Sequence, residues 1–245
     1  MDFQKKIALV TGAAVGIGRA CALKFAEYGA DVILVDRDEE KLEQAKKELS
    51  AFGHRVLAYT CDIRREAEVE AAVKAALDEF GRIDILVNNA AIWRSFHSFE
   101  ETTTEEWQTM FDINVNGTMY FTRAVLPGMA ERKWGRIINI ASVAGVYGNG
   151  NMVTYSATKG AVIAMTRALA KEVALKGITV NAVSPGSVSP SGVSDPDHTQ
   201  PSELCYMNRT GSDNENARLI CYLASEEAAY ISGQNIQIDG CRKKI

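Results

Sequence analysis

The side chains best suited to chemistry lie between Ser142 and Lys159. Tyr155 and Lys159 are four residues apart in a helical pattern, so both leave one face of the helix. Ser142 closes a strand-like run, at the end where open α/β sheets bind ligands. A phenol has a pKa of about 10, and a nearby ammonium lowers it by favouring the phenolate. The set predicts acid–base catalysis by Tyr155, tuned by Lys159, with Ser142 donating a hydrogen bond to a substrate oxygen.

A glycine-rich turn, TGAAVGIG at 11–18, joins a strand-like run to a helical one. Glycines in such a turn let the backbone bend tightly and approach a pyrophosphate, whose charge suits the free N–H groups of the helix. A plain tight turn is the alternative for these residues alone. The turn therefore predicts a dinucleotide site only together with its surroundings.

Asp36 is the residue outside the turn that supports a dinucleotide site. It ends the second strand-like run, where a carboxylate can accept hydrogen bonds from both ribose hydroxyls of an adenosine. The same charge repels a 2′-phosphate, which favours NAD over NADP, although the adjacent Arg37 partly offsets that repulsion.

Strand-like and helical runs alternate along the whole chain. Strands that are apolar on both faces and are each followed by a helix predict a parallel sheet covered by helices on both sides. Right-handed crossovers make this a doubly wound sheet. We expect a single Rossmann-type α/β domain over 1–245 with about seven strands. The expected strands are 6–11, 31–36, 56–61, 83–88, 136–140, 179–183 and 234–239, and the expected helices are 17–28, 39–52, 66–80, 104–132, 153–176 and 214–225.

Composition excludes several classes of protein. The chain has 245 residues, 47% of them hydrophobic, and a net charge of −4 without a basic block, which argues against nucleic acid as a partner. Five scattered cysteines fit reduced thiols in the cytoplasm, and no stretch is apolar enough to span a membrane. No metal site is expected, because Asp195, Asp197 and His198 lie in a proline-rich loop without a partner cluster.

Four of the five prolines fall within 185–201, so this segment is neither helix nor regular strand. Long irregular loops in compact domains are usually lids or binding loops. We expect 187–208 to form a substrate lid. Trp93, Phe96 and His97 follow the fourth strand on the same side, where they either line an apolar pocket or pack within their own loop.

Together these motifs resemble the short-chain dehydrogenases/reductases in their single-domain branch of about 250 residues. The resemblance covers 6–240 and rests on TGAAVGIG at 11–18, Asp62, NNAA at 88–91, Asn114, Ser142, Tyr155 with Lys159, and Pro185-Gly186. It implies hydride transfer between NAD(H) and a secondary alcohol or ketone, such as a hydroxysteroid or polyol. Members of this family pair through the two helices beside the site, which implies a homotetramer or a dimer.

The resemblance also assigns roles to individual residues. Asn114 joins Ser142, Tyr155 and Lys159 as the fourth catalytic position, anchoring a water in a proton relay, and Lys159 also holds the nicotinamide ribose. Asp62 and Ile63 lie against the adenine, and Val188 contacts the carboxamide. The implied cofactor-binding set is Gly12, Gly16, Ile17, Gly18, Asp36, Arg37, Asp62, Ile63, Asn89, Ala90, Tyr155, Lys159, Pro185, Gly186 and Val188.

Three positions depart from the family pattern: Ala91, Pro190 and Cys241 stand where glycine, threonine and glycine are common. The threonine of the family touches the cofactor amide, so with Pro190 this contact is either lost or made by Ser187 or Ser189 instead. Two alternatives stay open. One is a 3-oxoacyl-thioester reductase that uses NADPH, which Asp36 disfavours. The other is a non-catalytic cofactor sensor, which we expect to have lost Ser142, Tyr155 or Lys159.

Overall fold

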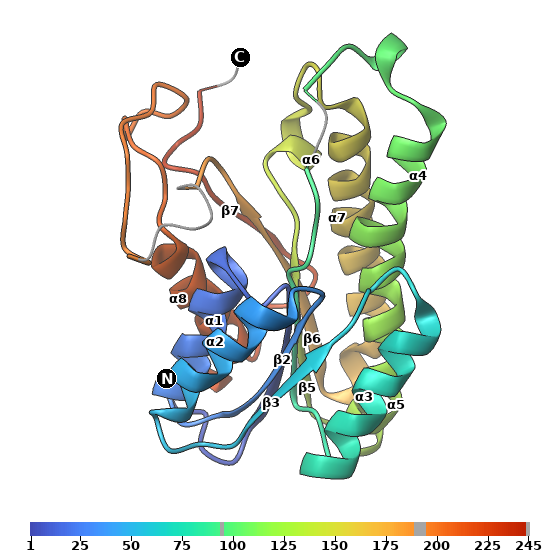
Figure 1. The fold of residues 1–245 in the computed structure, drawn as a ribbon, viewed down its shortest axis with the longest axis vertical. Coiled ribbons are helices and arrows are strands. Elements are labelled where there is room, and N and C mark those ends of the chain that lie inside the picture. Colours follow the sequence, from blue (N-terminus) through green and yellow to red (C-terminus); the bar gives the residue numbers. More distant parts are fainter. Residues whose placement is uncertain (94–95, 189–194, 244–245) are drawn as a thin grey trace.

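The computed structural model describes residues 1–93, 96–188 and 195–243. In these residues seven strands form one parallel sheet in the order β3-β2-β1-β4-β5-β6-β7, with helices on both faces (Figure 1). This confirms the Rossmann-type, single-domain prediction. The strands are β1 (Ile7–Thr11), β2 (Asp31–Asp36), β3 (Val56–Thr60), β4 (Ile85–Asn88), β5 (Gly135–Ile140), β6 (Ile178–Pro185) and β7 (Asn235–Ile238).

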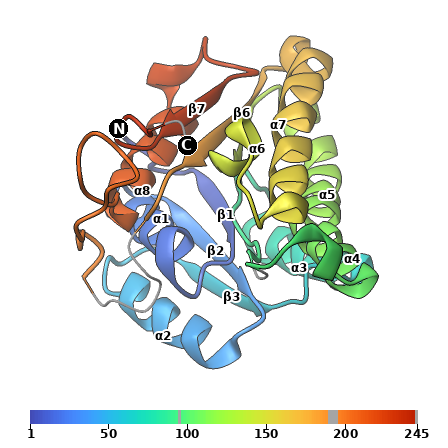
Figure 2. The same ribbon diagram turned by 90° about the horizontal axis from the view of Figure 1, so that it is seen from above.

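Two layers of helices cover the sheet (Figures 1 and 2). One layer holds α1 (Gly16–Glu27), α2 (Glu39–Ser50) and α8 (Asp213–Ala224), and the other holds α3 (Glu66–Phe80), α4 (Thr104–Phe111), α5 (Thr118–Glu131) and α7 (Val153–Val173). A short helix, α6 (Ala144–Tyr147), precedes α7. Each layer encloses its own hydrophobic core.

Strand β1 shows why the strands read as continuous apolar runs. Ala8 and Val10 point into the core under α1, α2 and α8, whereas Ile7 and Leu9 point into the core under α3, α5 and α7. Successive side chains of a strand alternate between faces, and here both faces are buried. A parallel sheet between two helical layers follows from this pattern.

The prediction of a single helix over 104–132 is wrong in one respect. A π-helical segment, Asp112–Gly117, separates α4 from α5. A π-turn inserts an extra residue into a helix and often marks a functional site. Asn114 lies inside this turn, which changes the direction of its side chain without ending the helix.

The proline-rich segment lies partly outside the described residues, since 189–194, with Pro190, are not described. The expectation that 185–201 contains no regular strand is wrong at its start, because Pro185 ends β6. The described part of 187–208 is tied to the C-terminal segment: Tyr206 N–H donates to the Cys241 carbonyl and Lys243 N–H to the Leu204 carbonyl. The role of 187–208 as a lid stays a prediction.

Among the described residues, no helix is both long enough and apolar enough to cross a bilayer.

Candidate active site

The site lies where the strand order reverses. Strand β1 is flanked by β2 and β4, so the connections leave it toward opposite faces of the sheet. Ligands of open α/β sheets bind in the crevice at the carboxyl ends of such strands. The glycine-rich turn follows β1 at this edge, and Asp36 and Asn88 end β2 and β4.

Two glycines let the turn after β1 close tightly. Gly12 has φ +64°. A Cβ on Gly18 would collide with the Gly12 carbonyl oxygen. Asn89 completes the turn, since its Nδ2 donates to the carbonyls of Thr11 and Gly12 at 3.0 and 3.1 Å. The backbone is therefore held in a shape that only glycine permits.

The N-terminus of α1 is left open for an anion. Its N-cap, Val15, has no capping side chain, and the first turn carries no acidic residue. Helices α2, α4 and α8 are capped by Asp38, Thr103 and Ser212, whereas α3 and α7 also lack a capping side chain, so the position of α1 after the glycine turn is what distinguishes it. Free N–H groups at a helix N-terminus bind phosphate well, so this end fits the pyrophosphate of a dinucleotide.

Asp36 faces that turn. Its Oδ2 accepts a hydrogen bond from the Ala14 N–H at 3.1 Å, and its Oδ1 accepts from Arg37 and Asp38 N–H at 2.7 and 3.1 Å. The carboxylate is partly exposed beside the glycine turn, and Arg37 is exposed. This geometry suits recognition of a ribose diol.

The two residues expected to contact the adenine, Asp62 and Ile63, follow β3, one strand further along the sheet. The Asp62 carboxylate is paired with Arg64, whose Nη2 lies 2.5 Å from Oδ2. That hydrogen bond lowers the pKa of Asp62, so it stays ionised. Ile63 is buried against Gly117 at the end of the π-turn. An adenine contact by Asp62 therefore has to share the carboxylate with Arg64.

The end of β6 forms the far wall. Pro185 is its last residue, and Gly186 N–H donates to the Ile238 carbonyl at 3.0 Å. Val188 forms an isolated bridge with Gly211. The remaining cofactor positions, Gly16, Ile17 and Ala90, lie in or against the glycine turn, and Ala90 N–H donates to Thr11 Oγ1.

Ser142 and Tyr155 meet at the carboxyl end of β5. Ser142 lies near enough to Tyr155 to lower the pKa of its hydroxyl, and Ser142 Oγ accepts from the Ala144 N–H at 3.1 Å. Gly145 lets α6 approach α7 closely, because a Cβ there would lie 2.5 Å from the Lys159 carbonyl carbon. The two helices thus bring the hydroxyls together.

Lys159 is buried behind them. Its Nζ donates to the Ile140 carbonyl at 2.7 Å and lies 5.8 Å from the centre of the Tyr155 ring. Burial lowers the pKa of Lys159 to about 8. Burial also raises the pKa of Tyr155, opposed only by the bond to Ser142. The pKa of Tyr155 is therefore raised and not lowered, because desolvation exceeds the effect of Ser142.

The side chain of Asn114 is used entirely for positioning. Its Oδ1 accepts from Ile92 N–H at 2.8 Å, and its Nδ2 donates to the Ile92 carbonyl at 2.9 Å and to Thr158 Oγ1 at 3.1 Å. Thr158 in turn donates to the Tyr155 carbonyl at 2.8 Å. Asn114 therefore links the segment after β4 to the helix that carries Tyr155.

Two threonines at the site were missed by the sequence reasoning. Thr11 Oγ1 accepts from the N–H groups of Asn89 and Ala90, which joins the ends of β1 and β4. Thr158 joins Asn114 to Tyr155. Position in the sequence was the only available signal: Thr11 precedes the first glycine of the turn, and Thr158 precedes Lys159.

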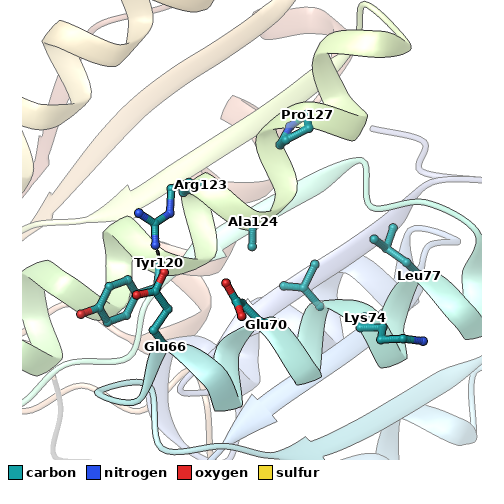
Figure 3. Close-up of a pocket in the computed structure, with 9 residues that line it drawn as sticks. Glu66, Glu70, Lys74, Leu77, Tyr120, Arg123, Ala124 and Pro127 are labelled. Atoms are coloured by element: carbon teal, nitrogen blue, oxygen red, sulfur yellow. Dashed lines mark ion pairs between the residues drawn. The ribbon is translucent and has the colours of Figure 1, made fainter.

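A separate groove of about 360 Å³ lies between α3 and α5 (Figure 3). Its rim carries an ion pair between Glu66 and Arg123, with Glu70 and Lys74 beside it. None of the predicted site residues lines it.

Comparisons with known proteins agree with this geometry. A family model described as short chain dehydrogenase matches residues 6–201. The (2S)-[(R)-hydroxy(phenyl)methyl]succinyl-CoA dehydrogenase subunit BbsD of Thauera aromatica is 40% identical over 99% of this chain and 98% of that protein. The 3-oxoacyl-[acyl-carrier-protein] reductase FabG of Thermotoga maritima is 37% identical over 98% of each.

The fold agrees as closely with a solved structure. The 3-ketoacyl-(acyl-carrier-protein) reductase from Brucella melitensis complexed with NADH has a TM-score of 0.91 and 34% identity, with 100% of both chains covered.

Proposed function

The chain belongs to the short-chain dehydrogenase family and is an oxidoreductase, and from this premise we propose that it transfers a hydride between NAD(H) and a secondary alcohol or ketone. The observation that carries the proposal is the buried Lys159 ammonium, which donates to the Ile140 carbonyl at 2.7 Å and lies 5.8 Å from the Tyr155 ring, with Ser142 near the phenol. A sensor without catalysis has no need for this arrangement.

Tyr155 is the proton donor and acceptor. In ketone reduction its hydroxyl gives a proton to the substrate oxygen as the carbon receives a hydride, and in alcohol oxidation the phenolate takes that proton back. The nicotinamide, when bound, supplies or accepts the hydride. Burial raises the pKa of Tyr155, which keeps it protonated at neutral pH, the form that reduction requires.

Ser142 and Lys159 support that proton transfer. Ser142 Oγ is held by the Ala144 N–H, so its proton is directed to Tyr155 or to a substrate oxygen. The Lys159 ammonium, below its pKa of about 8, favours the phenolate electrostatically. Because it already donates to the Ile140 carbonyl, its position is fixed before any ligand binds.

The cofactor we propose is NAD(H). Asp36 presents carboxylate oxygens beside the glycine turn, where a 2′-phosphate would meet a negative charge. The NADH complex of the Brucella melitensis relative supports the same preference. Arg37 is exposed and next to Asp36, so the preference for NAD over NADP is expected to be partial.

The second candidate is a 3-oxoacyl-thioester reductase. It is favoured by the relatives, because one acts on an acyl-carrier-protein thioester and another on a CoA thioester by their names. Its keto group would meet the same Tyr155 and Ser142, so the two candidates differ in substrate and not in chemistry.

The experiment is a panel of secondary alcohols, ketones and 3-oxoacyl thioesters, each with NAD(H) and NADP(H), followed by the absorbance of the reduced nicotinamide. We expect turnover of alcohols and ketones with a higher kcat/KM for NAD(H). Turnover of thioesters alone, with NADPH, establishes the second candidate. Tight NADH binding with no turnover of any substrate establishes a sensor.

We also propose that the protein is a homotetramer or dimer that pairs through α5 and α7. The outer side of α7 carries small exposed residues at helical spacing, Ala157, Ala164 and Ala168, and Met119 on α5 is 46% exposed. Small residues let two helices pack closely. Light scattering is expected to give a multiple of 26.7 kDa, and Ala164→Arg is expected to yield monomers.

A further inference from the structure

The segment after β4, which carries two aromatic rings, is tied to the site at its start. Ile92 is held by both its N–H and its carbonyl to Asn114, and Asn114 is joined through Thr158 to the Tyr155 backbone. Trp93 is the next residue. Four hydrogen bonds therefore fix the start of this segment relative to the hydroxyl that transfers the proton.

The two rings pack against each other, and both remain exposed to solvent. Trp93 and Phe96 pack edge to face, with ring centroids 5.6 Å apart and planes at 80°. Yet Trp93 is 60% exposed and Phe96 65% exposed. His97 does not share this surface, since its ring nitrogens lie near the Ser98 carbonyl and the Glu106 carboxylate. The pair is a preformed apolar surface open to solvent.

Further exposed apolar side chains follow the neighbouring strands. They come after β5 and β6, at the same carboxyl edge of the sheet as Trp93 and as the Ser142–Tyr155 pair. These side chains are Tyr147, Val153, Leu204, Tyr206 and Met207. Exposed apolar side chains therefore occur on more than one loop at this edge, where a ligand can bury them.

We propose that Trp93 and Phe96 bind an aromatic ring of the substrate, so that the substrates are secondary alcohols or ketones bearing an aryl group. The inference rests on the proposed function and names its substrate class. A third ring can pack edge to face or offset on the pair, which contributes beyond the burial of apolar area. A saturated ring of the same size gains the area alone.

The test compares two ketones that differ only in the ring: 1-phenylpropan-2-one and 1-cyclohexylpropan-2-one. In both, the ring is one carbon from the carbonyl, so conjugation does not alter the intrinsic reactivity. We expect the wild type to favour the phenyl compound roughly 2- to 10-fold in kcat/KM, mostly through KM. Butan-2-one serves as the small reference substrate.

Variants of Trp93 and Phe96 distinguish the effect of an aromatic ring in the protein from the effect of apolar size alone. Trp93→Leu keeps an apolar side chain and is expected to abolish the preference for phenyl over cyclohexyl. Phe96→Ala is expected to raise KM for the phenyl ketone several-fold. Phe52→Ala is the matched control, because Phe52 is 44% exposed but lies between α2 and β3, at the opposite edge of the sheet.

Equal kcat/KM for the two ring ketones in the wild type overturns the inference, and activity on butan-2-one then leaves the proposed function intact. Absence of turnover on every alcohol and ketone overturns the proposed function itself. A loss of NADH affinity in Trp93→Leu, or a change in its oligomeric state by light scattering, shows that Trp93 is structural or lies between subunits, and overturns the inference as well.

Discussion

The cofactor side and the substrate side of the site are built by different means. On the cofactor side, backbone groups and short polar side chains bond one another: Thr11 joins Asn89, and Asp36 accepts from three N–H groups. On the substrate side, large apolar side chains such as Trp93 and Tyr206 are more than half exposed. The polar side chains of the cofactor side bond one another and leave the N–H groups at the start of α1 open, whereas the substrate side has apolar surface to bury.

This difference follows from what each side recognises. A pyrophosphate and a ribose are the same in every dinucleotide, so a fixed backbone turn and one carboxylate suffice. Substrates differ in shape and polarity, and loops at the end of a rigid sheet can vary without changing the fold. Substitutions on the cofactor side should therefore alter the binding of the dinucleotide whatever the substrate, whereas substitutions on the substrate side should alter which substrates are preferred.

The largest effect is expected where the two sides meet, at Tyr155. Tyr155→Phe keeps the ring and its packing but removes the oxygen that transfers the proton, so turnover should fall about 10²–10⁴-fold. NADH affinity, measured by fluorescence titration, should change little. Residual activity close to that of the wild type would show that the proton goes to another group.

The next effect sharpens the assignment of the cofactor side. Asp36→Ala removes a charged acceptor, and hydrogen bonds to charged groups contribute about 1.5–3 kcal/mol each. We expect kcat/KM with NAD to fall at least tenfold relative to kcat/KM with NADP. Arg37→Ala is the paired variant and should shift the ratio the other way, since it removes the cation beside a 2′-phosphate. An unchanged ratio in both would contradict the role of Asp36.

A smaller effect tests whether the backbone turn is as closed as it looks. The Cβ of Gly18→Ala would meet the Gly12 carbonyl and Asn89 Nδ2, and overpacking of this kind costs about 1–3 kcal/mol. Unfolding in urea should show that loss together with weaker NADH binding. Gly150→Ala is the control, because nothing lies within 4 Å of a Cβ there and its φ is not positive. Equal stability of the two variants would mean that the turn adapts.

The elements were largely predictable from the sequence because they rest on local patterns. Asp31–Asp36 and Glu66–Phe80 have the predicted bounds. The π-turn at Asp112–Gly117 was missed because its sequence continues a helical pattern, and only tertiary contacts select the extra residue in the turn. The short helix α6 was missed for a related reason, since Gly145 opposes helix formation but allows contact with α7.

Some features of the site were likewise predictable from the sequence, and others were not. The glycine turn, Asp36, Ser142, Tyr155 and Lys159 come together at one edge because the carboxyl ends of parallel strands meet there. The pKa of Tyr155 was not predictable, since it depends on burial, which a motif does not report. The hydrogen bonds of the Asn114 side chain to Ile92 and Thr158 were not predictable from the sequence either.

The last prediction concerns Lys159, which both sides share, and it is read from stability against pH. Burial lowers its pKa in the folded protein to about 8 from 10.5. Below pH 8 the lysine is protonated in both the folded and the unfolded states. Between pH 8 and 10.5 the unfolded state binds more protons, so the free energy of unfolding rises with pH, by at most about 1.4 kcal/mol per unit. Lys159→Met lacks this term, so urea unfolding of the two proteins at pH 8 and pH 9.5 should show the wild type gaining stability relative to the variant. A constant difference would mean that Lys159 keeps an ordinary pKa, and that its ammonium remains beside Tyr155 throughout this range.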